Sequence, residues 1–328
     1  MDISIDMGSV NTTIHIAGIG IVLCEPTVAI VQKAKKLELR FAGAAAQKML
    51  GKTSVGAEVV YPVAEGVVVK PDAAVLMLRY FLNKVISAGM IKQKLRALVS
   101  CSCGLSLADR RALESVYMAA GLSEVILIDT PLALMQNVAD NNAFFVDIGG
   151  GTSEIAAVNE STGIIKGYSL NIGGLTIDNM ITDYMAEKCG LKIGRQTAEK
   201  IKNTVGSLYE NDISEFTVNG KDLVSGAPAT ADITAAALRE SIRDLIDKII
   251  DVTRAVLKLV PPDMIMEINK RGIYLCGGVS KLAGLSEYFC NALNLKIKSL
   301  DATAAVNGLS VLAQDKAKLG RLLSLEKI

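Results

Sequence analysis

Two stretches of this chain follow the same plan, and this internal repeat constrains the fold more than any other feature of the sequence. ISIDMGSVNTTIHI (residues 3–16) and FFVDIGGGTSEIAA (residues 144–157) each place Asp-x-Gly and small or hydroxyl residues between two apolar, strand-like segments. Asp6 of the first copy aligns with Asp147 of the second. The two copies therefore lie 141 residues apart (147 − 6). The repeats of solenoid proteins are much shorter than this, so the pattern predicts two related domains.

The second copy contains three consecutive glycines, Gly149–Gly151, where its two strand-like segments meet. A tight hairpin is one interpretation, because Asp and Gly dominate turns that need positive φ. A hairpin needs only one or two such residues, and further glycines add to the entropy lost on folding. The other interpretation is a backbone that approaches a phosphate closely. The repeat favours this second interpretation: two loops facing each other across a cleft would hold phosphates, with Asp6 and Asp147 holding Mg²⁺ through water.

The rest of the chain predicts an α/β protein. Each copy continues as a β-meander, and amphipathic helical patterns follow at residues 72–85, 108–120, 176–189, 195–208 and 234–260. A third glycine motif, RGIYLCGGVS (271–280), ends an apolar strand before a helical pattern at 281–294. A glycine-lined junction of this kind lets a base or ribose lie against the backbone. The run KAKKLELR (33–40) is interpreted as a solvated hairpin.

Composition excludes several classes of protein. The 328 residues are half hydrophobic, which is enough for two domains with buried cores. With 35 Lys and Arg against 34 Asp and Glu, the formal net charge of +1 gives no reason to expect nucleic acid as a partner. No apolar run reaches the roughly 18 residues of a membrane span, and Met1-Asp2 leads into a strand instead of a signal peptide. We therefore expect a cytoplasmic protein whose six cysteines are mostly buried free thiols.

Taken in order, these motifs resemble those of the MreB family, the bacterial actins, within the superfamily of actin, sugar kinases and heat-shock ATPases. The resemblance covers nearly the whole chain, through segments such as IDMGSVNTTIHIAGIGIVLCE, NIGGLTIDNMI and IGRQTAEKIKNTVGS. It implies an actin-like two-lobed α/β fold, made of two duplicated ribonuclease-H-like domains with small inserted subdomains around a nucleotide cleft. We expect lobe I at residues 1–140, with an insert at about 30–70, and lobe II at 141–328, with an insert at about 175–240. The C-terminal segment is expected to return toward lobe I.

The resemblance also implies a set of site residues for ATP and Mg²⁺. The metal is expected near Asp6 and Asp147, with Asp147 and Thr152 also taking part in catalysis. Residues expected to contact the nucleotide lie in the first loop, the second loop, one helix and the third glycine motif; they are Gly8, Ser9, Val10, Asn11, Gly149, Gly150, Gly151, Thr152, Thr197, Glu199, Lys200, Lys202, Gly277, Gly278, Val279 and Ser280.

The chain departs from the family at the position of a catalytic residue. Where the family usually has Glu-Glu-Pro-Met-Ala, with the second Glu positioning the attacking water, ILIDTPLALM (126–135) has Asp129 and Thr130. A hydroxyl holds a water but is no base at neutral pH, so general-base help of about 10²–10⁴-fold is missing. We therefore expect nucleotide binding with slow hydrolysis. Ser9 in place of Thr and Val279 in place of a third Gly are milder departures.

The resemblance further implies assembly and contact with a membrane. Subunits of this family stack into paired protofilaments on the inner face of the cell membrane, so the expected partners are further copies, paralogous subunits, cell-wall or shape-determining proteins and an anionic bilayer. The segment VISAGMIKQKLR (85–96) places Met90 and Ile91 among Lys92, Lys94 and other basic residues. Two apolar residues among lysines fit shallow insertion into an anionic surface, although an ordinary loop with chance charges explains the segment too.

Three other functions compete with a filament-forming bacterial actin that organises cell shape. A small-molecule kinase of the superfamily needs an aspartate base beside an acceptor pocket, and no candidate lies in the matching region. A heat-shock chaperone carries a separate peptide-binding domain, for which we expect no room in this chain. An actin-like adaptor that binds ATP without forming filaments is the hardest alternative to exclude, and Thr130 favours it slightly.

Overall fold

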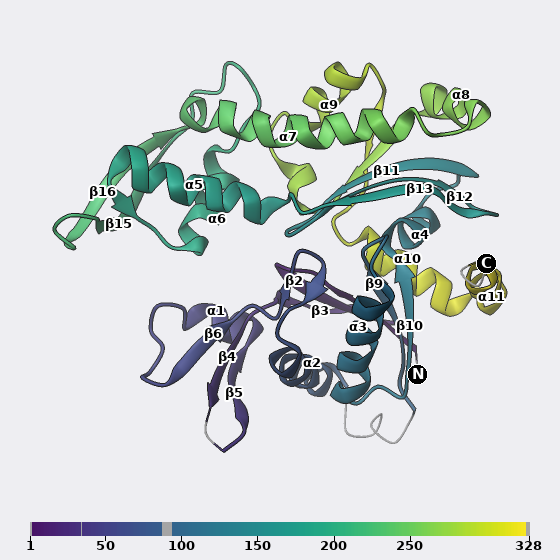
Figure 1. Ribbon diagram of the computed structural model, residues 1–328, viewed down its shortest axis with the longest axis horizontal. Coiled ribbons are helices and arrows are strands. Elements are labelled where there is room, and N and C mark those ends of the chain that lie inside the picture. The colour runs from purple at the N-terminus through teal and green to yellow at the C-terminus, as the bar shows by residue number, and fades with distance from the viewer. Residues whose placement is uncertain (1, 34, 87–93, 326–328) are drawn as a thin grey trace. The chain divides into compact units, whose positions relative to one another are not determined.

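The computed structural model describes residues 2–33, 35–86 and 94–325, and its chain divides into two compact units (Figure 1). Unit 1 comprises Met1–Phe145, Ala156–Ser169 and Asp301–Ile328, and unit 2 comprises Val146–Ile155 and Leu170–Leu300. No helix among the described residues has both the length and the apolar character needed to cross a bilayer.

Unit 1 is built on a five-stranded mixed sheet with the strand order β10-β9-β1-β2-β3. Strand β1 pairs antiparallel with β2 and parallel with β9, and β2 pairs antiparallel with β3. The strands span Asp2–Met7 (β1), Asn11–Ile16 (β2), Gly20–Pro26 (β3), Arg96–Cys101 (β9) and Glu124–Asp129 (β10). The meander of β1, β2 and β3 confirms the strand pattern expected for the first copy of the repeat.

Helices cover this sheet and complete the core of unit 1. Helices α2 (Pro71–Val85) and α3 (Leu107–Ala120) pack side by side, and α10 (Ala304–Gln314) packs against β1 and β9 (Figure 1). The alternating residues Ile3, Ile5 and Met7 of β1 join a buried cluster with side chains of α2 and α3. Ser106 caps α3 by accepting a hydrogen bond from the Asp109 N–H at 3.1 Å. Further helices of the unit are α4 (Thr130–Leu134), the 3₁₀ helix η1 (Met135–Asn137) and α11 (Lys316–Leu325).

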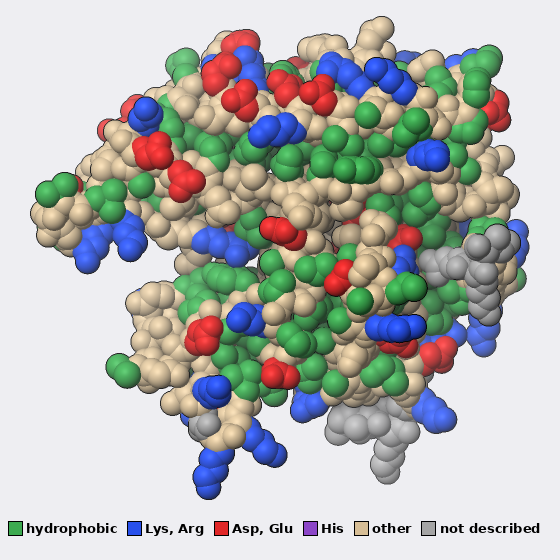
Figure 2. All heavy atoms as spheres, viewed as in Figure 1, with side chains coloured by type: hydrophobic (Ala, Val, Ile, Leu, Met, Phe, Trp, Pro, Cys, Tyr) green, Lys and Arg blue, Asp and Glu red, His purple; other side chains and the backbone are tan. Residues whose placement is uncertain are grey.

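A small sheet lies within the first part of unit 1. Its strand order is β5-β4-β6, with β4 at Ala29–Lys33, β5 at Leu37–Ala42 and β6 at Ala57–Val60, while α1 spans Gly43–Lys48. Two further short strands, β7 (Val63–Ala64) and β8 (Val67–Val68), pair with each other. Strands β4 and β5 form the hairpin predicted from KAKKLELR, and basic side chains gather at its end, where Lys33, Lys35 and Lys36 are exposed (Figure 2). This outcome confirms a solvated hairpin.

The second five-stranded sheet repeats the strand order of the first. Its order is β13-β12-β11-β17-β18, so a three-stranded meander again continues into two strands that pair parallel with each other. The strands span Asn142–Ile148 (β11), Ser153–Asn159 (β12), Gly163–Leu170 (β13), Ile273–Cys276 (β17) and Ile297–Ser299 (β18). The internal repeat seen in the sequence is therefore a duplication of topology as well.

Unit 2 also contains five helices of eight residues or more and a small sheet. The helices are α5 (Gly174–Cys189), α6 (Arg195–Val205), α7 (Ala235–Leu257), α8 (Pro262–Arg271) and α9 (Leu285–Leu293), with the 3₁₀ helix η2 at Gly278–Lys281. The small sheet has the order β14-β15-β16, with strands at Leu191–Lys192, Glu215–Asp222 and Pro228–Thr234. Helix α7 packs against α5 and α9 (Figure 1).

The predicted extent of α7 was wrong at its C-terminal end. The helical pattern continues to Val260, but the helix ends at Leu257 and Leu259 is 62% exposed. The prolines that follow explain the difference, because the residue before a proline is disfavoured in the helical conformation, and Pro262 instead begins α8. The thiols also differ in part from expectation: Cys101, Cys103 and Cys276 are buried, whereas Cys24 and Cys290 are exposed.

Candidate functional site

The two strand-connecting loops of the repeat have the same local geometry. In the first loop, which lies in unit 1, the Gly8 N–H donates to the Asn11 carbonyl at 2.9 Å. In the second loop, which lies in unit 2, the Gly149 N–H donates to the Thr152 carbonyl at 2.9 Å. A Cβ atom built on either glycine would lie 3.2 Å from that carbonyl oxygen. The aligned positions of the repeat thus adopt one conformation in both units.

The glycines of these loops are not explained by a turn that needs positive φ. Every described glycine with positive φ lies elsewhere in the chain, and Gly8 and Gly149–Gly151 are not among them. The second loop instead receives the start of helix α5: the Gly174 N–H donates to Gly149 O at 3.0 Å, and the Leu175 N–H to Gly150 O at 2.8 Å. A Cβ atom on Gly173 would lie 2.7 Å from Gly150 O. Close backbone approach is therefore the feature of this loop, and the N-terminus of a 16-residue helix lies beside it.

Helix α6 adds a buried cation next to the start of α5. The Lys202 ammonium donates to Gly174 O at 3.2 Å and lies 2.8 Å from the Asp178 carboxylate. Burial raises the pKa of Asp178, while the charge of Lys202 lowers it and that of Glu199 raises it. Lys202 and Glu199, both predicted from the sequence, are thus brought together around Asp178.

Asp178 and the Gly173-Gly174 pair were missed as individual site residues. Only their segment, NIGGLTIDNMI, was singled out. The signal that identifies the glycines is a Gly-Gly pair directly before a helical pattern, but nothing in the spacing shows that Asp178 meets a lysine of the next helix.

Two other predicted residues of α6 point to different neighbours. The Lys200 ammonium lies 5.1 Å from the ring centroid of Phe216 in β15. The Thr197 N–H donates to Gly194 O at 2.9 Å in the first turn of the helix. Lys200 therefore packs on the small sheet of unit 2, away from the cluster around Asp178.

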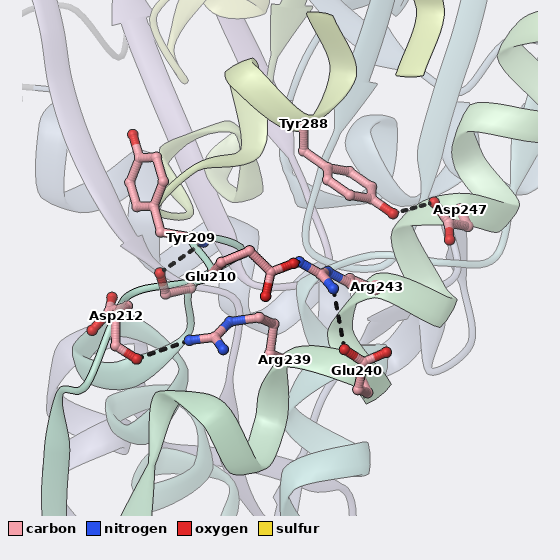
Figure 3. Close-up of polar contacts among 9 residues, drawn as sticks. Tyr209, Glu210, Asp212, Arg239, Glu240, Arg243, Asp247 and Tyr288 are labelled. Carbon is pink, nitrogen blue, oxygen red and sulfur yellow. Dashed lines mark hydrogen bonds and ion pairs between the residues drawn. The ribbon is translucent and has the colours of Figure 1, made fainter. Parts of the chain in front are cut away.

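The loop that follows α6 is held to α7 by charged side chains (Figure 3). Arg239 donates to the Asp212 carbonyl at 2.8 Å, and Arg243 forms ion pairs with Glu210 and, at 3.1 Å, with Glu240. Figure 3 shows both arginines projecting from α7 toward this loop. These contacts fix the loop between α6, the helix that carries Lys202, and β15.

The third glycine motif lies against the second loop within unit 2. Gly277 follows β17 with φ of +82°, and a Cβ atom there would lie 2.3 Å from Ile148 O and 2.5 Å from the Asp147 carboxylate. Only glycine fits this position. Ser280 donates to Gly277 O at 2.7 Å, which closes the turn. Gly278, in contrast, is exposed, and a Cβ atom there would meet nothing within 4 Å among the described residues.

Val279 connects the motif to the start of α5. A Cβ atom on Gly174 would lie 3.3 Å from Val279 Cγ2 and 3.1 Å from Lys202 Nζ. Within unit 2, the second loop, the third motif and Lys202 therefore surround one short backbone segment. This cluster, formed by residues 147–152, 173–174, 178, 202 and 277–280, is called the unit 2 cluster below.

The aligned aspartates occupy comparable positions at the ends of β1 and β11. Asp6 is partly buried and accepts a hydrogen bond from Ser100 Oγ at 2.7 Å. Burial raises the pKa of Asp6, and the bond from Ser100 opposes that shift. The Asp6 carboxylate, which is partly accessible and forms no ion pair with a lysine or arginine of the described residues, fits a hydrated Mg²⁺ ion.

Thr130 and Asp129 lie where β10 meets α4. Thr130 is buried, and its hydroxyl donates to the Cys101 carbonyl at 3.1 Å. The Asp129 carboxylate forms an ion pair with Arg110 and accepts a bond from Cys101 Sγ at 3.4 Å. Burial raises the pKa of Asp129, and Arg110 opposes the shift. The proton of Thr130 and the charge of Asp129 are both engaged within unit 1.

The predicted membrane segment is described only in part. Met90, Ile91 and Lys92 lie outside the described residues, and Lys94 is exposed.

Comparison with known proteins identifies the family. The family model of the MreB/Mbl protein matches residues 1–321. The chain is 32% identical to the cell shape-determining protein MreB of Escherichia coli K12 over 293 residues, which cover 87% of this chain and 84% of that protein. It is 30% identical to the cell shape-determining protein Mbl of Bacillus subtilis over 325 residues, covering 96% and 97% of the two chains.

Solved structures agree with this relationship. MreB5 of Spiroplasma citri bound to ADP superimposes with a TM-score of 0.88 at 27% identity, covering 97% of each chain. A MamK double helical filament has a TM-score of 0.80 at 17% identity, covering 96% of this chain and 99% of that one, a likeness that concerns the fold alone. Both confirm the actin-like α/β fold implied by the resemblance. The loop geometry, the duplicated sheets and the family match lead to one conclusion: this chain belongs to the MreB/Mbl family, the bacterial actins.

Proposed function

We propose that this chain binds ATP and Mg²⁺ through the glycine loops of both repeats and polymerises into filaments that organise cell shape. The observation that supports nucleotide binding most strongly is the unit 2 cluster, where the partly exposed glycine backbone of the second loop, the start of α5 and Lys202 adjoin one another. MreB5 of Spiroplasma citri was solved with ADP and with AMPPNP, the latter at a TM-score of 0.87 and 27% identity.

Each part of the chain has a distinct role in this proposal. Backbone N–H groups of Gly150–Thr152 hold phosphate oxygens, and those of Ser9 and Val10 do so from unit 1. The N–H groups of Gly8, of Gly149 and of the first turn of α5 donate to carbonyls of the protein and shape the loops instead. Glu199 and Lys202 lie on the adenosine side, while Gly277–Ser280 close over the base or ribose. Asp6 and Asp147 hold Mg²⁺ through water, and the bound ion neutralises charge on the phosphates.

Hydrolysis is proposed to be slow. The Thr130 hydroxyl donates its only proton to the Cys101 carbonyl. Its oxygen retains lone pairs that orient a water molecule but do not deprotonate it. Asp129 does not replace the missing base, because Arg110 neutralises its charge. Cleavage then sets the lifetime of the filament and not its formation.

Assembly and location follow from the family. The relatives in Escherichia coli and Bacillus subtilis bear the name cell shape-determining protein, and we propose the same role here. The proposed partners are further copies in paired protofilaments, paralogous subunits, proteins of the cell-wall machinery and the inner surface of the cell membrane. Residues 90–94 are proposed to contact the bilayer, and repeated weak contacts along a filament add up through avidity.

Gly278 provides the sharpest test of the nucleotide site. An added Cβ atom there meets no described atom within 4 Å apart from its chain neighbours, so we expect Gly278→Val to fold and to fill the space proposed for the base or ribose. We expect the variant to lose most of its affinity for a fluorescent ADP analogue while its unfolding transition stays unchanged. Gly320→Ala in α11, where an added Cβ also meets nothing, is the control and retains full affinity. Equal affinity of Gly278→Val and the wild type would exclude nucleotide from this motif.

A further inference from the structure

The hydroxyl group of Ser100 forms a hydrogen bond with the carboxylate of Asp6, which is proposed to hold the metal. Ser100 in β9 donates to Asp6 Oδ1 in β1 at 2.7 Å, although the two residues are far apart in the sequence. The parallel pairing of the strands explains the contact: Ile5 pairs with Val99, so Asp6 and Ser100 follow at the next position. Side chains at the same register position of neighbouring strands project to the same face, and these two meet at the C-terminal ends of their strands.

Because both side chains are at least partly buried, the hydrogen bond holds the Asp6 carboxylate in one orientation. Ser100 is buried, 8% exposed, and Asp6 is partly buried, so neither side chain is free to rotate into bulk solvent. No lysine or arginine of the described residues forms an ion pair with Asp6, and this hydroxyl is therefore the group seen to orient it. A hydrogen bond fixes one carboxylate oxygen and directs the other, as partners of ligating carboxylates do in metal sites.

We propose that Ser100 is a positioning residue for Mg²⁺, which holds the Asp6 carboxylate in the orientation that receives the hydrated ion. The inference rests on the proposed function, since it assumes that Asp6 faces the metal of a bound nucleotide. Ser100 itself touches neither metal nor nucleotide; it acts through Asp6. Loss of the partner of a directly ligating residue typically weakens metal affinity by about 10–100-fold, and because Asp6 acts through water we expect the lower end of that range.

The test measures metal binding directly and does not depend on turnover. Mg²⁺ is titrated into the full-length protein with a fixed concentration of a fluorescent ADP analogue, and the midpoint is compared between variants. Ser100→Ala is expected to raise the Mg²⁺ midpoint about tenfold, with ADP affinity in EDTA unchanged. Ser4→Ala is the matched control, because Ser4 is also buried and precedes Asp6 by two residues on the same face of β1; its midpoint should equal that of the wild type.

A second pair of variants separates the hydroxyl from the packing. Ser100→Thr and Ser100→Val add nearly the same volume, but only threonine retains the donor. Ser100→Thr should therefore keep the wild-type Mg²⁺ midpoint, whereas Ser100→Val should raise it as Ser100→Ala does.

Three results would overturn the inference in distinguishable ways. An unchanged midpoint in Ser100→Ala, with a clear Mg²⁺ effect in the wild type, would remove the role of Ser100 and leave the proposed function in place. If Ser100→Ala lowers ADP affinity equally in EDTA and in Mg²⁺, Ser100 supports the fold of the site and does not position the metal. If the ADP affinity of the wild-type protein does not change with Mg²⁺ concentration, the proposed metal role of Asp6 is wrong, and so is this inference.

Discussion

The ammonium group of Lys202 lies 2.8 Å from the carboxylate of Asp178, with 12% and 3% of their side chains exposed. The pair joins α6 to α5 beside the second glycine loop, so the helix proposed to contact adenosine and the helix that supports the proposed phosphate loop share one buried ion pair. Such a pair adds little net stability by comparison with apolar residues, but removing one partner leaves an uncompensated buried charge.

Lys202→Met is therefore expected to lower the free energy of unfolding by about 3 kcal/mol, measured by urea denaturation at neutral pH. Lys200→Met is the matched control, two positions earlier on the same helix. Its ammonium is exposed and lies over Phe216, so its loss should be much smaller. Similar losses in both variants would show that Asp178 does not depend on Lys202 for its charge.

Thr130→Glu is expected to accelerate ATP hydrolysis. The carboxylate supplies a base at the position proposed to orient the attacking water, and general-base help contributes about 10²–10⁴-fold. Because Thr130 is only 8% exposed, we expect an increase at the lower end of that range. Phosphate release is the measurement, with Thr130→Gln as the control of equal size that lacks the base. If the glutamine variant is accelerated as much, the effect comes from size and the role assigned to position 130 is wrong.

The thiols should fall into two classes in a labelling experiment. Cys24 and Cys290 are exposed and should react with a maleimide within minutes at neutral pH, whereas Cys101, Cys103 and Cys276 are buried. Burial also raises the pKa of Cys276 well above its usual value, which suppresses the reactive thiolate. Mass spectrometry after brief labelling should find the buried three unmodified until urea unfolds the chain. Rapid modification of Cys276 would contradict the packing of the third glycine motif.

Tyr288 should titrate late at alkaline pH. Burial and its hydrogen bond to Asp247, 2.8 Å long and visible in Figure 3, raise its pKa to about 12. Between about pH 10, the ordinary tyrosine pKa, and pH 12 the folded state keeps this proton while the unfolded chain loses it, so stability falls as pH rises. Burial also raises the pKa of Tyr117 well above its usual value, so Tyr117 titrates late as well. The late rise in absorbance at the tyrosinate wavelength should therefore lose amplitude in Tyr288→Phe without disappearing. An unchanged late amplitude in the variant would contradict the assignment to Tyr288.

The parts of the fold that the sequence predicts are those with local or repeated signals. The alignment of Asp6 with Asp147 predicted two loops of one kind, and the matching Gly8–Asn11 and Gly149–Thr152 bonds have that geometry. Most helices were placed to within a few residues because their apolar stripes are local. The end of α7 was missed because the stripe continues past Leu257 while Pro261-Pro262 alone stops the helix.

Contacts between elements could not be predicted in the same way. The sequence of β9 or of β1 alone does not predict the hydrogen bond between Ser100 and Asp6, because that contact depends on the register of the two strands. The pairing of Lys202 with Asp178 likewise depends on how α5 and α6 pack. The glycines of the second loop were linked to close approach, but their neighbour within the protein, the Gly173-Gly174 segment, emerged only from the structure.

The central claim is nucleotide-dependent assembly, and high-speed sedimentation of the purified protein with ATP, ADP or no nucleotide tests it most directly. We predict pelleting above a threshold concentration that depends on the nucleotide, with Gly278→Val losing the dependence and Gly320→Ala retaining it. Absence of pelleting under every condition, in a protein that binds ATP, would contradict the filament and identify a non-polymerising actin-like adaptor instead.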